Sequence, residues 1–238
     1  MSSRRHQTRC VIRDAATLIL LKLDGGAPRV LMGRRAAGHA FMPGVFVFPG
    51  GRRERADCFT PPGRDLHPAV LDKLQKRMRG KASPGRARGL AMAAVRETCE
   101  ETGFLAACPR PARWRCGNDA WRAFAERNLA PDLSHLRYFA RAITPAGMAR
   151  RFDARFFIMD ARHLAKARAA LPLDAPELLG LCWLSIDETR IRPLPRITRR
   201  ILDLLQEALE REGPGLFAPH RPVPFHYKRG KTWRLEWL

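Results

Sequence analysis

The segment from residue 89 to residue 103 constrains the fold of this chain more than any other part of the sequence. Small residues recur there at i, i+4, i+7 and i+11, which is helical spacing, and they form the stripe Ala91, Val95, Thr98 and Thr102. Gly103 follows at the position where a left-handed residue commonly ends a helix. We therefore predict a helix over 89–102 that packs its small-residue stripe against a neighbouring layer.

Strand-like segments lie on both sides of this predicted helix. Aliphatic and β-branched residues at 15–23 and 29–35, separated by the turn signal DGGAP, predict a hairpin, and GVFVFPGG at 44–51 predicts a third short strand. Downstream of the helix, the sequence predicts strands and then a long helix, at 136–144, 151–161, 177–186 and 196–213. Strands on both sides of a central helix, with a second helix late in the chain, predict a mixed α/β sandwich.

The length of 238 residues suits one large domain or two small ones. Residues 58–88 hold proline and glycine turns and one short amphipathic helix, and they contain too few apolar side chains for a core of their own, so we interpret them as a surface insertion. Residues 214–238 are rich in proline and aromatic side chains and are predicted to be an irregular tail. We predict a single domain over 1–238.

The chain is strongly basic, with a formal net charge of +21 from 44 Lys and Arg against 23 Asp and Glu. Such an excess is typical of proteins that bind nucleic acid or another polyphosphate, but it also arises on a surface that is simply rich in arginine. We favour the second interpretation, because the charge is spread along the chain without the interleaved aromatic residues of a single-strand platform. Nucleic acid is therefore a possible but not an expected partner, and phosphorylated ligands would still be attracted.

The sequence predicts neither a membrane span nor a secretory signal. The apolar run at 15–21 stops at Lys22, well short of the ~20 residues that a span requires, and Arg13 and Asp14 interrupt the segment after the basic start. The six cysteines contain no C-x-x-C pair, which argues against a zinc site and a disulfide framework. We expect a cytoplasmic protein with reduced thiols.

Three glutamates gather on one face of the predicted helix. Glu97, Glu100 and Glu101 fall within about a third of its circumference, opposite the small-residue stripe. Like charges at this spacing cost only about 0.2–0.5 kcal/mol per pair, so the pattern alone also fits a solvated face. Hard divalent cations, however, bind converging carboxylate oxygens, and the neighbouring Arg96 would hold one carboxylate in a fixed rotamer.

The segment FPGG at 48–51 places two glycines at the end of a strand, where the backbone can approach a ligand closely. Asp57 lies six residues after Gly51. This order resembles the Nudix box, G-x5-E-x7-R-E-U-x-E-E-x-G-U, in which U is a bulky aliphatic residue. Gly51 matches its first glycine and Asp57 its first glutamate, and the helical part is matched by Arg96, Glu97, Glu100, Glu101, Gly103 and Phe104.

The chain departs from this box in three places. Asp57 is one carbon shorter than glutamate, Thr98 stands where an aliphatic residue is expected, and the seven-residue gap before Arg96 is replaced by residues 58–95, an insertion of 31 residues. A long split of this kind is similar to the Nudix type 19 subfamily of peroxisomal coenzyme A diphosphatases. Two further segments are similar to that subfamily, FMPGVFVFPGG at 41–51 and ITPAGMARRFDARFFI at 143–158.

The resemblance implies a Nudix-type α/β/α sandwich with a mixed sheet and an insertion inside the box. It also implies metal-dependent hydrolysis of a nucleoside diphosphate linked to another group. The ligands it implies for Mg²⁺ or Mn²⁺ are Glu97, Glu100, Glu101 and the carbonyl of Gly50. The resemblance implies Glu97 and Arg96 as catalytic residues. It leaves two roles for Glu97: a metal ligand or the group that deprotonates the attacking water.

Coenzyme A or an acyl derivative is the substrate that the subfamily resemblance implies, although Phe46 stands where that subfamily's signature has valine. Arg34 and Arg35 would clamp substrate phosphates as bidentate donors, and Gly51 and Asp57 complete the expected substrate-binding residues. The alternatives are a pyrophosphohydrolase of nucleotide sugars, dinucleotides or RNA 5′ ends, a non-catalytic ligand sensor, and a nucleic-acid-binding module. The sequence does not predict an oligomeric state.

Two other groups of polar residues have less specific interpretations. Glu177 precedes a strand at a place where some Nudix proteins supply a late carboxylate, and we interpret it as solvent-facing. The strand at 151–161 alternates aromatic residues, which we assign to the core, with Arg151, Asp153 and Arg155, which either line a substrate cleft or face solvent.

Overall fold

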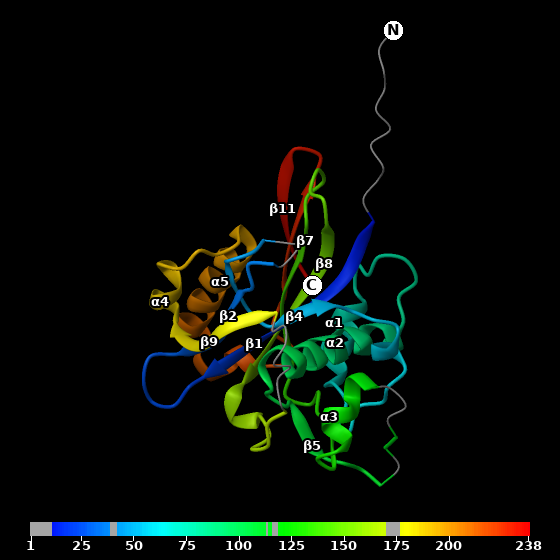
Figure 1. Cartoon of the computed structure of the whole chain (residues 1–238). Coiled ribbons are helices and arrows are strands. Elements are labelled where there is room, and N and C mark those ends of the chain that lie inside the picture. Colours follow the sequence, from blue (N-terminus) through cyan, green and yellow to red (C-terminus); the bar gives the residue numbers. More distant parts are fainter. Residues whose placement is uncertain (1–10, 39–41, 113, 116–118, 170–176) are drawn as a thin grey trace.

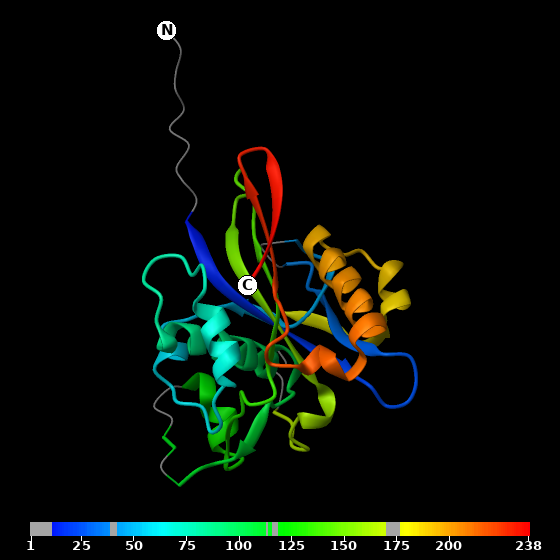
Figure 2. The same cartoon turned by 180° about the vertical axis from the view of Figure 1, so that it is seen from behind.

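A mixed sheet lies between two helical layers in the computed structural model of this chain (Figure 1). The described residues are 11–38, 42–112, 114–115, 119–169 and 177–238. The helices on the two faces, also seen from behind in Figure 2, are α1 (Pro68–Gln75) and α2 (Pro84–Thr102) on one side and α4 (Ile186–Arg190) and α5 (Arg196–Glu212) on the other. This arrangement confirms the predicted α/β/α sandwich.

The main sheet has nine strands in the described part of the chain. They are β1 (Ile12–Lys22), β2 (Arg29–Arg35), β3 (Phe46–Val47), β4 (Gly50–Arg52), β7 (Arg137–Ile143), β8 (Arg151–Asp160), β9 (Leu178–Ser185), β10 (Pro224–Arg229) and β11 (Thr232–Trp237). The central path runs β11-β10-β7-β8-β1-β2-β3, with β4 on β1 and β9 on β2. The pairs β1–β8 and β7–β10 are parallel and the remaining pairs are antiparallel, so the sheet is mixed as predicted.

Strand β1 is buried on both faces of the sheet, which explains its continuous aliphatic run. Leu18 and Leu20 belong to the hydrophobic cluster that contains α2, whereas Ile19 and Leu21 belong to the cluster that contains α5. The predicted hairpin of β1 and β2 forms, with Leu21 opposite Val30. The sheet therefore holds α2 at a fixed position over β1, with its other face covered by α5.

Helix α2 begins five residues earlier than the sequence predicted. Ser83 caps its start by accepting a hydrogen bond from the backbone N–H of Arg86 at 3.2 Å, and Pro84 occupies the first turn, where no N–H is needed. At the other end Gly103 has φ 71° and donates to the carbonyl of Cys99 at 2.9 Å, as predicted. The predicted small-residue stripe is fully buried against the sheet.

The insertion at 58–88 is only partly a surface feature, which corrects the prediction. Val70 and Leu74 of α1, together with Leu66 and Met78 beside it, are buried in the same hydrophobic cluster as α2. The segment lacks a core of its own, as expected, but its apolar residues extend the core of the main body.

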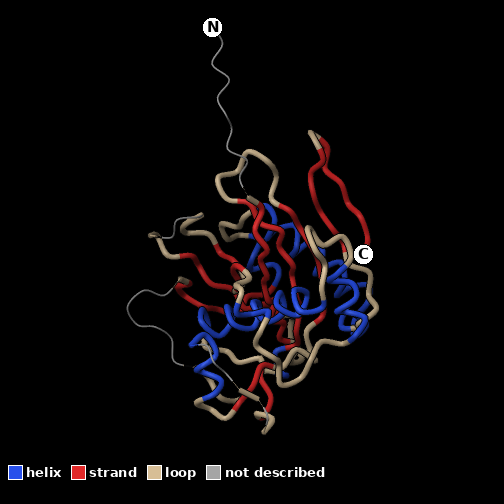
Figure 3. The backbone as a smooth tube through the Cα atoms, turned by 90° about the vertical axis from the view of Figure 1, so that its right-hand side faces the viewer, coloured by secondary structure: helices blue, strands red, loops and turns tan. Residues whose placement is uncertain are grey.

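The prediction for the C-terminal segment is also wrong, because residues 214–238 are not an irregular tail. A 3-10 turn, Gly213–Phe217, is followed by the hairpin of β10 and β11, and β10 pairs with β7, so the hairpin extends the sheet. Figure 3 shows it as two strands that project from the body near the C-terminus. The two-residue connection begins at Gly230 with φ 59°, a hairpin signal that the proline and aromatic content of this segment concealed.

The region between α2 and β7 contains more regular structure than the sequence predicted. A small second sheet pairs β5 (Ala107–Pro109) with β6 (Leu129–Pro131), and α3 (Arg122–Ala125) lies between them in sequence. The remaining short helices are of 3-10 type, at Ala56–Cys58, Asp119–Trp121 and Ala161–His163. None of the helices in the described part of the chain has the length and apolar character that crossing a membrane requires.

From the sequence, Arg151, Asp153 and Arg155 of β8 are expected to line a substrate cleft or to face solvent. For Asp153 and Arg155 neither expectation holds. Asp153 and Arg155 are almost completely buried. Arg141 on β7 binds Asp153 with Nη2 to Oδ2 at 2.7 Å, and Arg155 Nη1 lies 3.0 Å from Asp153 Oδ1 and 3.3 Å from Asp14 Oδ1. The strand thus carries an ion-pair network through the middle of the sheet.

Candidate active site

Arg96 lies at the centre of the acidic face of α2 and binds Asp57, which is fully buried. The guanidinium of Arg96 donates from Nε to Asp57 Oδ1 at 2.9 Å, and from Nη2 to Asp57 Oδ2 at 3.2 Å and to the carbonyl of Arg52 at 2.9 Å. Asp57 Oδ2 also accepts from the backbone N–H of Glu54 at 2.7 Å. Both oxygens of Asp57 are used within the protein, so this residue positions Arg96 and does not suit the substrate contact that the sequence predicted.

The remaining N–H groups of Arg96 hold two of the three predicted metal ligands. Nη1 donates to Glu97 Oε1 at 3.0 Å and to Glu100 Oε2 at 2.9 Å. Burial by itself would lower the pKa of Arg96, but the hydrogen bond to Asp57 and the charges of the surrounding carboxylates raise it above its ordinary value. Arg96 is therefore a permanent cation that fixes the side chains of Glu97 and Glu100.

Glu101 is held by the first of the two glycines that begin β4. Its Oε2 accepts a hydrogen bond from the backbone N–H of Gly50 at 2.8 Å. Gly50 has φ 152°, and a Cβ there would lie 2.5 Å from the carbonyl oxygen of Ala16, while a Cβ on Gly51 would collide with the carboxylate of Glu97. The two glycines therefore pack directly against the carboxylates: only glycine fits at position 50, and a larger residue at position 51 would displace the carboxylate of Glu97.

The pKa values of all three helix carboxylates are raised. Burial raises the pKa of Glu97 to about 7, with Arg96 opposing the shift and Glu100 adding to it. Burial also raises the pKa of Glu100, and it raises that of Glu101 well above the usual range. Burial thus disfavours the charged form of these carboxylates, and a bound divalent cation would offset that cost.

The donor set fits Mg²⁺ or Mn²⁺ in its chemistry. Glu97, Glu100 and Glu101 each have one oxygen held by Arg96 or Gly50, and their second oxygens form no hydrogen bond within the described residues. Carboxylate oxygens are the ligands that hard divalent cations prefer. In the present side-chain positions, no three His, Cys, Asp or Glu side chains of the described residues converge closely enough to hold a metal ion. Metal binding therefore requires the free carboxylate oxygens to move together.

The structure separates the two arginines that the sequence predicted as phosphate clamps. Arg35 is half-buried; burial lowers the pKa of Arg35, and the negative charges of Glu101 and Glu177 oppose that shift. Arg34 is exposed, as expected for the adjacent residue on a strand, whose side chain points to the opposite face. Of the two, Arg35 is the one that lies with the carboxylates.

Glu177 is a residue that the sequence interpretation placed outside the site. It is exposed, as predicted, but its charge contributes to raising the pKa of both Glu97 and Glu101. The pairing of β9 with β2 brings it there, because the carbonyl of Glu177 accepts from the backbone N–H of Ala36 at 3.1 Å. Only its position just before a strand could have indicated this location from the sequence.

The raised carboxylate pKa values predict how metal-free protein responds to pH. The pKa of Glu97 is about 7 in the folded protein and 4.5 in an unfolded chain, so between these values the folded state holds a proton that the unfolded chain releases. Stability should therefore fall as the pH rises from about 5 to 8, by up to about 3 kcal/mol from this residue. Urea denaturation in EDTA measures this, and Glu97→Gln should make the profile less steep, with the remaining slope due to Glu100 and Glu101. A wild-type profile no steeper than that of the variant would contradict the prediction.

The fold of this chain is similar to the folds of solved proteins. No protein-family model matches the chain. The chain is similar to the solved structure of a NUDIX hydrolase from Alicyclobacillus acidocaldarius, with 28% sequence identity, coverage of 84% of this chain and 96% of that chain, and a TM-score of 0.59. It is also similar to the Nudix hydrolase RenU from M. smegmatis, with 20% identity, coverage of 84% and 88%, and a TM-score of 0.40. This second similarity is too distant to carry an argument.

Proposed function

The chain belongs to the Nudix hydrolase superfamily and is a pyrophosphohydrolase of nucleoside diphosphate derivatives, and we propose that its substrate is coenzyme A or an acyl-coenzyme A. The proposed products are 3′,5′-ADP and the corresponding phosphopantetheine. The observation that supports hydrolysis most strongly is that Glu97 and Glu101 pack against Gly50 and Gly51 of β4, with Glu100 beside them on Arg96, and that one oxygen of each carboxylate forms no hydrogen bond within the described residues.

The side chains of α2 would bind the divalent cation and orient the reactants. We propose Glu97, Glu100 and Glu101 as its ligands, together with the carbonyl of Gly50. A bound Mg²⁺ or Mn²⁺ would supply neutralisation of the nonbridging phosphate oxygens and activation of a water. Arg96 does not contact the substrate in this mechanism; it holds two carboxylates in place through the bonds described above.

Proton transfer falls to the carboxylates of the same site. In the metal-free protein burial raises the pKa of Glu97 to about 7; a bound cation would lower it, so near neutral pH the ionised carboxylate would be able to accept a proton. Glu97 is therefore proposed either as a ligand or as the group that deprotonates the attacking water. Arg35 is proposed to bind a diphosphate oxygen, because it lies with Glu101 and carries the fork of donors that phosphate oxygens accept.

A substrate screen tests the proposed specificity. Purified protein with Mg²⁺ or Mn²⁺ is offered coenzyme A, acyl-coenzyme A, NADH, ADP-ribose, nucleotide sugars and triphosphorylated RNA, and products are identified by mass spectrometry. We expect the highest kcat/KM for a coenzyme A compound, with 3′,5′-ADP as a product and no turnover in EDTA. A higher kcat/KM for any of the other substrates would reject the coenzyme A assignment while retaining the diphosphatase.

A further inference from the structure

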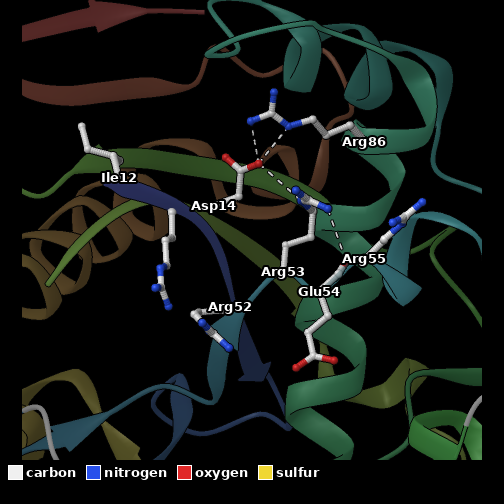
Figure 4. A pocket seen from close by; sticks show the side chains of 8 residues that line it. Ile12, Asp14, Arg52, Arg53, Glu54, Arg55 and Arg86 are labelled. Atoms are coloured by element: carbon white, nitrogen blue, oxygen red, sulfur yellow. Dashed lines mark hydrogen bonds and ion pairs between the residues drawn. The ribbon is translucent and has the colours of Figure 1, made fainter. Parts of the chain in front are cut away.

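A cavity lined mainly by arginines lies beside the carboxylates. It has a volume of about 530 Å³, and five of its eight lining residues are arginines. These are Arg13, Arg52, Arg53, Arg55 and Arg86, which we call the arginine pocket. The acidic residues of the lining are Asp14 and Glu54, so the pocket is net positive. Figure 4 shows that its side chains come from the start of β1, from β4 and the loop after it, and from the first turn of α2.

Four of the five arginines of this pocket fall into two kinds, and the fifth, Arg55, lies with its guanidinium over the ring of Phe59. Arg53 and Arg86 are engaged with Asp14, at 3.3 Å from Nε and 2.7 Å from Nη2 to Asp14 Oδ2, and Figure 4 shows Asp14 between them. The guanidinium groups of Arg13 and Arg52 form no hydrogen bond or ion pair with any part of the chain that the structure describes. Two cations are thus available to a ligand, while the other two hold the wall of the pocket.

The arginine pocket adjoins the carboxylate site directly. Arg52 follows Gly51 in the chain, and its carbonyl accepts the hydrogen bond from Arg96 Nη2 at 2.9 Å. Glu54 lines the pocket, and its negative charge contributes to raising the pKa of Glu100. Successive residues of a strand advance about 3.3 Å, so the end of the pocket at Arg52 lies one residue along β4 from Gly51, whereas its far end at Arg86 lies in the first turn of α2. A ligand whose diphosphate lies at Gly50 and Gly51 can place another group in the pocket.

We propose that the arginine pocket binds a phosphate monoester on the nucleoside part of the substrate, separate from the diphosphate that is cleaved. The inference rests on the proposed function, since in coenzyme A this group is the 3′-phosphate of the ribose. Arginine side chains bind phosphate with paired, charge-assisted hydrogen bonds, and Arg13 and Arg52 are unengaged in the described structure. The neighbouring carboxylates would repel a phosphate that has no cation between it and them. The diphosphate would therefore bind at the carboxylates through a cation, and the phosphate monoester would bind in the arginine pocket.

Equilibrium binding tests the pocket independently of hydrolysis. Calorimetry in EDTA compares adenosine 3′,5′-bisphosphate with 5′-AMP for the wild type, Arg13→Ala, Arg52→Ala and the control Arg199→Ala, an exposed arginine of α5. The wild type and the control should bind the bisphosphate at least about tenfold more tightly than 5′-AMP, since hydrogen bonds to charged groups contribute that much or more. Arg52→Ala and Arg13→Ala should each reduce this ratio severalfold. Equal binding of both nucleotides by the wild type, or an equal loss in the control, would overturn the proposal.

Kinetics separate this inference from the proposed function. The ratio of kcat/KM for coenzyme A to that for 3′-dephospho-coenzyme A should be at least about ten in the wild type and should fall toward one in Arg52→Ala. A wild type that cleaves both substrates equally rejects the pocket and keeps the coenzyme A assignment. A wild type that cleaves neither, but cleaves another nucleoside diphosphate derivative, rejects coenzyme A, and the calorimetric ratio then decides the pocket alone.

Discussion

Glu101→Gln is expected to lower kcat/KM by at least about 100-fold, a loss comparable to removal of a principal electrostatic group from an active site. Glutamine has the same shape, and its amide oxygen can still accept the hydrogen bond from the N–H of Gly50. What it lacks is the negative charge that binds a divalent cation. The measurement is steady-state hydrolysis at several concentrations of Mg²⁺ and Mn²⁺.

The stability of the same variant distinguishes a lost ligand from a damaged fold. Burial raises the pKa of Glu101 strongly, so a neutral side chain there removes a desolvation penalty. In EDTA the variant should therefore unfold at the same temperature as the wild type or a higher one, and it should lose the increase that added metal gives the wild type. Glu207→Gln, at an exposed site on α5 across the sheet, is the matched control. Full activity in Glu101→Gln would show that the carboxylates of α2 are not the metal site.

The acidic face of α2 could be predicted from sequence because its evidence is local. The helical spacing of Glu97, Glu100 and Glu101 follows from 3.6 residues per turn, and the end of the helix follows from the requirement for a left-handed residue at Gly103. The aliphatic run in β1, followed by the turn signal DGGAP, likewise predicts a strand. In each case the information lies within a few residues of the feature it predicts.

The parts of the site that could not be predicted depend on pairing between distant segments. Glu177 reaches the carboxylates only because β9 pairs with β2, and the same register decides that Arg35 and not Arg34 lies with them. Asp57 has the polarity of a surface residue, and its burial follows from a partner 39 residues away. The arginine pocket was concealed for a different reason: in a chain this rich in arginine, five arginines from three segments give no compositional signal.

Arg96→Met should destabilise the protein by about 3–5 kcal/mol, because it leaves the fully buried carboxylate of Asp57 without its cation. Activity should fall as well, since Glu97 and Glu100 lose the group that fixes them. Urea denaturation in EDTA gives the first quantity. Arg122→Met, which removes an exposed arginine of α3, serves as the control and should change stability by no more than about 1 kcal/mol.

The double variant Arg96→Met with Asp57→Leu separates these two roles of the arginine. Removing both partners of a buried ion pair and filling the space with apolar side chains is often close to neutral, so most of the lost stability should return. Activity should not return, because Glu97 and Glu100 still lack their donor and are free to adopt other rotamers. Recovery of activity together with stability would mean that Arg96 acts only through the fold. Recovery of stability alone would show that the buried Asp57–Arg96 pair exists to hold the carboxylates in place.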